Sequence, residues 1–199
     1  DPETGAITMN EKIIPREVRT SQLVCPGMRG GKLWQTDAYN PLTNTLYSPV
    51  SNECIVFEIL PLEVSVSGLN YGQIEHMEGS GGQVGRLAAV SASTGELLWT
   101  YDQRAAIGSV LTTAGGLVFA GDLYRYFRAF DAETGKVLWE LPLNAPVTGY
   151  PISYAVDGKQ YVAVGVGEGT GGQRHLALLY PELKTPVGSN VLMVFALGD

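Results

Sequence analysis

The sequence predicts an all-β protein made of repeated short strands, and two observations lead to this prediction. The eleven residues 89–99 (AVSASTGELLW) recur as residues 129–139 (AFDAETGKVLW), which lie 40 positions later. No stretch of ten or more residues shows the apolar spacing of an amphipathic helix. The 199 residues are 45% apolar and 17% charged, a composition that excludes a largely disordered chain.

Each copy of the repeat predicts a β-hairpin. In the second copy, the apolar run 127–130 leads to Asp131, whose carboxylate can accept hydrogen bonds from backbone amides two residues on. Gly135 supplies the positive φ of a tight turn, and a second strand then runs through Trp139. The first copy has the same pattern. Further strands are expected at residues 87–90, 117–120 and 161–164.

Two shorter segments resemble parts of the same repeat. Residues 38–47 (AYNPLTNTLY) read as a worn copy, and residues 1–5 (DPETG) match the turn alone. Because the second match begins in the middle of a unit, we expect earlier chain to be missing.

Four short strands per 40 residues, with one tryptophan per unit, are typical of a β-propeller blade. Trp99 and Trp139 are each large enough to cover the turn of a neighbouring blade, with the indole N–H reaching a backbone carbonyl. The alternative is a two-layer sandwich in which both are ordinary core aromatics. We expect residues 1–199 to be a partial propeller of about four blade-sized portions, with the N-terminal blades outside this chain.

Charge and hydropathy exclude several classes of partner. Thirteen basic and 20 acidic residues give a net charge of −7, which offers no electrostatic footprint for nucleic acid. The longest apolar runs, such as residues 191–197, are far shorter than the roughly 18 residues needed to span a bilayer. The chain opens on an acidic segment, Asp1-Pro2-Glu3, and shows no signal peptide. Either a signal peptide has been removed or Asp1 is not the true start of the gene product.

Cys25 and Cys54 are the two cysteines. They are too few for a four-ligand zinc site. An even count in a chain rich in glycine and proline is compatible with one disulfide in an oxidising compartment, and two unrelated buried thiols are the alternative.

The repeat Ala-x-Asp-x-x-Thr-Gly-x-x-x-Trp is similar to the tryptophan-docking motif of the eight-bladed quinoprotein dehydrogenases. Residues 111–122 (LTTAGGLVFAGD), 149–154 (GYPISY) and 157–164 (DGKQYVAV) resemble the C-terminal blades of alcohol dehydrogenases that use pyrroloquinoline quinone (PQQ). The stretch 25–41 resembles an upstream blade of the same family. The resemblance covers essentially the whole chain.

This resemblance implies a periplasmic enzyme that oxidises an alcohol to an aldehyde or ketone. Its cofactors would be PQQ and a calcium or lanthanide ion, and the quinone itself would carry the redox chemistry. In the family, cysteines at this spacing form a disulfide, which implies a Cys25–Cys54 pair. The chain has no Cys-x-x-Cys-His haem motif, so a cytochrome-type electron acceptor would be a separate protein.

The family's catalytic aspartate and metal ligands belong to blades that would precede Asp1, so no catalytic or metal-binding residue is assigned here. Six positions are assigned to the cofactor's rim: Leu33, Trp34, Ile107, Gly169, Thr170 and Gly171. Many relatives have an asparagine that hydrogen-bonds the quinone where this chain has Leu33, and leucine cannot donate. A family tryptophan aligns with Ile107. Trp34 is the best preserved candidate contact, and packing within a blade is its alternative role.

The sequence offers two other functional interpretations, a dinucleotide-binding loop and a non-catalytic scaffold. The spacing of Gly165, Gly167 and Gly169 suggests a dinucleotide loop, but no predicted helix follows it, so that interpretation fails. A non-catalytic propeller that uses the same repeat as a periplasmic scaffold or assembly protein is the alternative to the enzyme.

Overall fold

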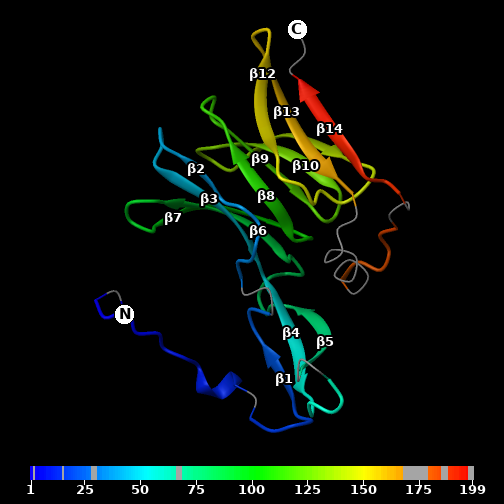
Figure 1. The fold of residues 1–199 in the computed structure, drawn as a ribbon. Coiled ribbons are helices and arrows are strands. Elements are labelled where there is room, and N and C mark those ends of the chain that lie inside the picture. The colour runs from blue at the N-terminus through cyan, green and yellow to red at the C-terminus, as the bar shows by residue number, and fades with distance from the viewer. Residues whose placement is uncertain are drawn as a thin grey trace.

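The computed structural model of the chain is built mainly of β-strands (Figure 1). It describes residues 1, 3–14, 16–27, 31–65, 69–167, 179–184 and 188–196, without the side chains of residues 69–72. A short 3-10 turn, η1 (Glu11–Ile13), precedes the strands. No helix in these ranges is long and apolar enough to cross a membrane.

The described strands form four antiparallel sheets. The first sheet has the order β2 (Ala38–Asn40), β3 (Thr45–Ser51), β6 (Gly85–Ser91) and β7 (Leu97–Gln103). The second sheet consists of β8 (Ile107–Thr112), β9 (Leu117–Asp122), β10 (Tyr126–Asp131) and β11 (Val137–Pro142). The third sheet contains β12 (Ile152–Val156), β13 (Lys159–Val166) and β14 (Val191–Ala196). A side sheet contains β1 (Ser21–Val24), β4 (Glu53–Ile59) and β5 (Leu69–His76).

The two intact repeats form the β6–β7 and β10–β11 hairpins, in consecutive sheets. In the second turn, Asp131 Oδ1 accepts hydrogen bonds from the amides of Glu133 and Thr134, at 3.1 and 2.8 Å. Gly135 has a φ of +70°, a conformation that residues with a Cβ rarely adopt. The predicted strands 87–90, 117–120, 127–130 and 161–164 lie within β6, β9, β10 and β13.

Trp99 of the first sheet docks on the turn of the second sheet. Its indole Nε1 donates to the carbonyl of Ala132 at 3.0 Å, and the Tyr47 hydroxyl donates to the same carbonyl at 3.0 Å. The indole lies so close to Gly135 that a Cβ there would sit 2.5 Å from its Cε3 atom. The predicted docking of a repeat tryptophan on the next unit's turn is therefore confirmed for Trp99.

Both faces of the second sheet are covered. One apolar core joins it to the first sheet through residues such as Leu87, Val118 and Phe130. A second core joins it to the third sheet through Phe127 and Val164. Sheets that follow one another in this way, each docked on the next, form part of a β-propeller, whereas a sandwich has only two layers. The all-β propeller prediction is confirmed.

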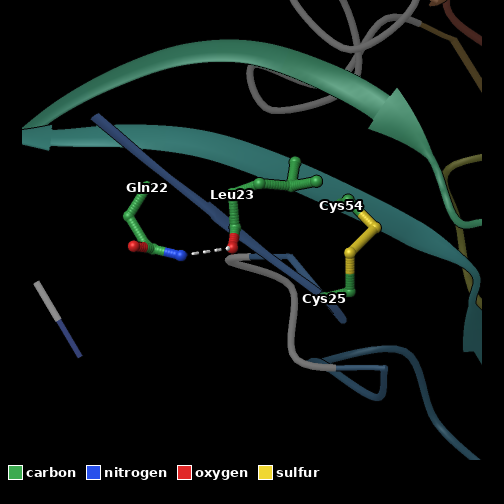
Figure 2. The surroundings of a disulfide bond; sticks show 4 residues. All are labelled: Gln22, Leu23, Cys25 and Cys54. Carbon is green, nitrogen blue, oxygen red and sulfur yellow. Dashed lines mark hydrogen bonds between the residues drawn. A yellow bond between two sulfur atoms is a disulfide. The ribbon is translucent and has the colours of Figure 1, made fainter. Parts of the chain in front are cut away.

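The side sheet grows out of the first sheet. Only Asn52 separates β3 from β4, so the chain leaves the first sheet, forms β4 and β5, and returns to it as β6 (Figure 1). A disulfide between Cys25 and Cys54 ties the end of β1 to β4, as the resemblance implied (Figure 2). Residues 38–47, matched to the repeat by sequence, form the β2–β3 hairpin of the first sheet rather than a docking hairpin in a sheet of their own.

Candidate functional site

The segments that lead into β2, β8 and β12 lie close together, at the same end of the first, second and third sheets. The strand β8 lies at the buried edge of its sheet, with its first four residues buried, whereas the opposite edge strand β11 is largely exposed. Two hydrogen bonds join the segment before β2 to β8. The Val110 amide donates to the Thr36 carbonyl at 3.1 Å, and the Thr36 amide donates to Ser109 Oγ at 3.2 Å.

Leu33 and Ile107 line the same small hollow at this end. The hollow has a volume of about 10 Å³, room for roughly one water molecule. Ser51, whose buried Oγ has no hydrogen-bond partner within the described chain, also lines it. Ile107 is 3% exposed and belongs to the core, whereas Leu33 is 44% exposed. Two positions 74 residues apart therefore shape one apolar wall.

Trp34 presents a half-exposed ring beside this hollow. Its ring centroid lies 6.2 Å from that of Tyr150, at an interplanar angle of 58°. The exposed fractions of the two residues are 53% and 52%. Aromatic pairs at this separation attract one another. The pair links the segment before β2, in the first sheet, to the segment before β12, in the third sheet.

Lys32 holds the Trp34 segment in place. Its ammonium donates to the carbonyls of Leu33 and Gln35 and lies 3.5 Å from a carboxylate oxygen of Asp37. The same Asp37 oxygen accepts a hydrogen bond from the Ser48 hydroxyl at 2.7 Å. The loop that carries Leu33 and Trp34 is thereby fixed to β3.

Close glycine packing fixes the Tyr150 segment. The Gly149 amide donates to the Gly165 carbonyl at 2.9 Å, and a Cβ on Gly149 would lie 2.7 Å from Gly165. Thr148 Oγ1 donates to the Gly167 carbonyl at 3.1 Å. The remaining predicted rim residues, Gly169, Thr170 and Gly171, lie outside the described residues.

Asp122 and Arg128 form a buried ion pair at 2.6 Å within the second sheet. The carboxylate also accepts a hydrogen bond from the Tyr126 amide, and the guanidinium also pairs with Glu140. Burial raises the pKa of Asp122, and the nearby Arg128 opposes this effect. The pair joins the neighbouring strands β9 and β10, so the Asp122 carboxylate has a structural partner.

The described residues contain no group of three or more His, Cys, Asp or Glu side chains that could hold a metal ion. What this end of the molecule offers is an apolar and aromatic surface on a fixed backbone. Such a surface can stack against a flat aromatic ring.

Comparison with known proteins agrees with this architecture. A family model described as "PQQ: Glucose/ethanol/alcohol dehydrogenase, beta-propeller domain" matches residues 103–162. The lanthanide-dependent methanol dehydrogenase of Methylacidiphilum fumariolicum (strain SolV) is 34% identical over 152 residues, which cover 73% of this chain and 25% of the relative. The lupanine 17-hydroxylase (cytochrome c) of Pseudomonas sp. is 32% identical over 201 residues, covering 100% of this chain and 29% of the relative.

The solved structure of a europium-containing methanol dehydrogenase superposes with a TM-score of 0.77 at 29% identity. The match covers 91% of this chain and 36% of that chain. Residues 103–162 thus match a PQQ-type dehydrogenase propeller, and most of the chain is similar to quinoprotein alcohol dehydrogenases. The chain spans 25% and 29% of the lengths of the two relatives named above.

Tyr150 and Lys32 belong to the candidate site but were not predicted from the sequence. Tyr150 stood in a segment that resembles the family, but nothing in the sequence placed it beside Trp34, 116 positions away. Lys32 precedes the two predicted rim residues directly, and a cation flanked by carbonyls and a carboxylate is visible only once the loop is folded.

Proposed function

We propose that this chain is the C-terminal portion of a PQQ-dependent alcohol dehydrogenase, which oxidises an alcohol to an aldehyde or ketone. The observation that carries the proposal is the half-exposed Trp34 ring in the segment that leads into β2, in a chain similar to methanol dehydrogenases over most of its length.

PQQ is flat and conjugated, so it needs an apolar surface against its ring. The half-exposed indole of Trp34, held by the Lys32 loop and supported by Tyr150, fits that need. Leu33 and Ile107 would contribute the apolar wall, and Gly169, Thr170 and Gly171 would complete the rim. When bound, the quinone takes up the electrons from the alcohol, and the protein's part is to hold and orient it.

The family resemblance supports placing the ligands of a calcium or lanthanide ion, and the general base, in blades that would precede Asp1. The described residues contain no cluster of His, Cys, Asp or Glu that could hold the ion. The chain's own contribution is then to bind the quinone rim and to restrict access of water to it through the Leu33–Ile107 wall.

Further propeller blades would pack against the third sheet. Its outer face exposes apolar side chains, with Ile152 at 55%, Val156 at 51% and Leu192 at 70% exposed. The other face of the same sheet packs on the second sheet through an apolar core of the kind that also joins the first and second sheets. A neighbouring sheet would cover the exposed face in the same way.

We assign electron acceptance to a separate cytochrome and location to the periplasm. One relative carries cytochrome c in its name, which supports the first assignment. The Cys25–Cys54 disulfide supports an oxidising compartment, where such bonds persist.

Dye reduction by the complete gene product tests the proposal. We expect an artificial acceptor dye to be reduced only when PQQ, a calcium or lanthanide salt and an alcohol are all present. Omitting any one of the three is the internal control. Absence of dye reduction with a panel of primary and secondary alcohols, in a folded protein supplied with both cofactors, would contradict the proposal and favour a scaffold role.

A further inference from the structure

Residues 179–184 lie between β13 and β14 in the sequence but pack against the first two sheets. Tyr180 is 1% exposed and joins a separate apolar cluster with Val84, Ala105, Ala106 and Leu123. These partners lie at the start of β6, in the β7–β8 connection and in the β9–β10 turn. The segment therefore packs next to the β7–β8 connection, whose residue Ala106 also lines the hollow with Leu33 and Ile107.

Arg104, Tyr124, Tyr180 and Glu182 hold this segment, and we call these four residues the latch. The Arg104 guanidinium lies 5.0 Å from the Tyr124 ring centroid and 5.4 Å from that of Tyr180. It also pairs with the Glu182 carboxylate, to which the Tyr124 hydroxyl donates at 3.3 Å. A guanidinium that lies over two rings is attracted to both, and its planar shape suits this arrangement better than an ammonium does.

The latch is joined directly to the backbone of the β7–β8 connection. The Tyr180 hydroxyl donates a hydrogen bond to the Arg104 carbonyl. The same carbonyl accepts a hydrogen bond from the Val84 amide at 3.2 Å. Two residues later, the Ala106 carbonyl accepts the Leu123 amide at 3.0 Å. A tyrosine hydroxyl is already protonated at neutral pH, and burial raises the pKa of Tyr180 further, so this hydroxyl acts as a hydrogen-bond donor.

The β7–β8 connection also forms the back of the candidate site. Ala106 and Ile107 line the hollow together with Leu33. Ala106 also belongs to the apolar cluster that contains Tyr180, so the latch and the hollow share this short piece of backbone. A shift of this backbone would move one wall of the site.

We propose that Arg104 and Tyr180 are positioning residues for the quinone site, acting through Ala105, Ala106 and Ile107. They do not touch the cofactor. They fix the backbone from which Ile107 projects, as supporting residues fix the geometry of a site from outside it. This inference rests on the proposed function, because it takes the Leu33–Ile107 wall to face the quinone.

The test compares Tyr180→Phe with Tyr39→Phe in the complete gene product. Each substitution removes one tyrosine hydroxyl bond and keeps the ring, but Tyr39 bonds Asn44 on the surface, at 2.9 Å. Equilibrium titration with PQQ is expected to show affinity weakened about 3- to 10-fold for Tyr180→Phe, the scale of one hydrogen bond, and unchanged for Tyr39→Phe. Hydrogen exchange at the Val84 and Leu123 amides is expected to accelerate in Tyr180→Phe alone.

A second pair, Arg104→Lys and Arg86→Lys, keeps the charge at both positions. Only the first removes a guanidinium that lies over two tyrosine rings, so only the first is expected to weaken PQQ binding. PQQ affinities within twofold of wild type for both Tyr180→Phe and Arg104→Lys would overturn the positioning role while leaving the proposed function in place. A folded wild-type protein that does not bind PQQ would overturn the proposed function, and the positioning role with it.

Discussion

Trp99 and Gly135 come from different copies of the eleven-residue repeat, and their contact joins the first sheet to the second. The indole reaches the Ala132 carbonyl only because Gly135 leaves room for it. Gly95 occupies the equivalent place in the other copy, has a φ of +72°, and would meet no atom within 4 Å if it carried a Cβ. The two glycines thus share a backbone requirement but differ in what they touch.

Alanine at these two glycines separates backbone strain from the docking contact. Gly95→Ala is expected to lower the free energy of unfolding by about 1–2 kcal/mol, the cost of a left-handed alanine. Gly135→Ala should cost an additional 1–3 kcal/mol or so, because the new methyl group displaces the Trp99 ring. Chemical denaturation of both variants measures the difference. Equal losses would show that the docked indole contributes nothing specific.

The side sheet is the element that the disulfide secures. Cys54 is 2% exposed in β4, and the bond connects residues 29 positions apart. In the chain-entropy model a loop of this length corresponds to roughly 3–4 kcal/mol. Replacing both cysteines by serine should therefore lower the free energy of unfolding by about that amount.

The readout is hydrogen exchange in β1, β4 and β5 compared with β8, β9 and β10. The loss of protection against exchange is expected to be concentrated in the side sheet, because the disulfide joins the end of β1 to β4 within that sheet. Adding a reductant to the wild-type protein should reproduce the effect, and the reductant should change nothing in the double serine variant. Uniform loss of protection across all sheets would contradict a local role.

A second element-scale prediction concerns the β6–β7 pair. Arg86 and Asp102 face one another across these strands with Nε–Oδ1 and Nη2–Oδ2 distances of 2.6 and 2.8 Å. The hydrogen bond from Arg86 lowers the pKa of Asp102 below its ordinary value of 3.8. A carboxyl group whose pKa is lower in the folded state stabilises the fold above its unfolded pKa, and this contribution is lost as the pH falls through the folded pKa.

Asp102→Asn should therefore lower the free energy of unfolding near neutral pH by less than about 1 kcal/mol, since the pair is partly exposed. The difference from wild type should shrink as the pH falls below about 4. Urea denaturation at pH 7 and pH 3 measures it, with Glu133→Gln, an exposed carboxylate, as the control. A difference that is the same at both pH values would exclude the ion pair as its source.

Elements encoded by local chemistry could be predicted from the sequence, whereas their assignment to sheets could not. Asp131 and Gly135 determine a turn through bonds and dihedral angles that involve only neighbouring residues, so the hairpin was predicted correctly. Residues 38–47 resemble the same hairpin and do form one, β2–β3, but it lies in the same sheet as the first intact copy. Strand pairing decides this, because the second partner of β3 is β6, which follows the whole β4–β5 segment in the sequence.

At the scale of the whole molecule, the repeat with its tryptophan was sufficient to predict a propeller, because a fixed period implies sheets that cover one another. The candidate site was predicted only in part. The family resemblance assigns Leu33 and Ile107 to one rim, and in the structure both line the same small hollow. The Trp34–Tyr150 pair, and the contacts of Arg104 and Tyr124 with residues 179–184, join segments more than 50 residues apart, for which the sequence carries no periodic signal.

Titration of the complete gene product with PQQ, followed by quenching of tryptophan fluorescence, tests the central claim most directly. We predict saturable binding by the wild-type protein, and binding weakened at least about 3- to 10-fold by Trp34→Ala, the scale of one aromatic contact. Trp139→Phe, on the outer strand β11, is the matched control and should bind as the wild type does. A correctly folded wild-type protein that shows no saturable binding would contradict the account.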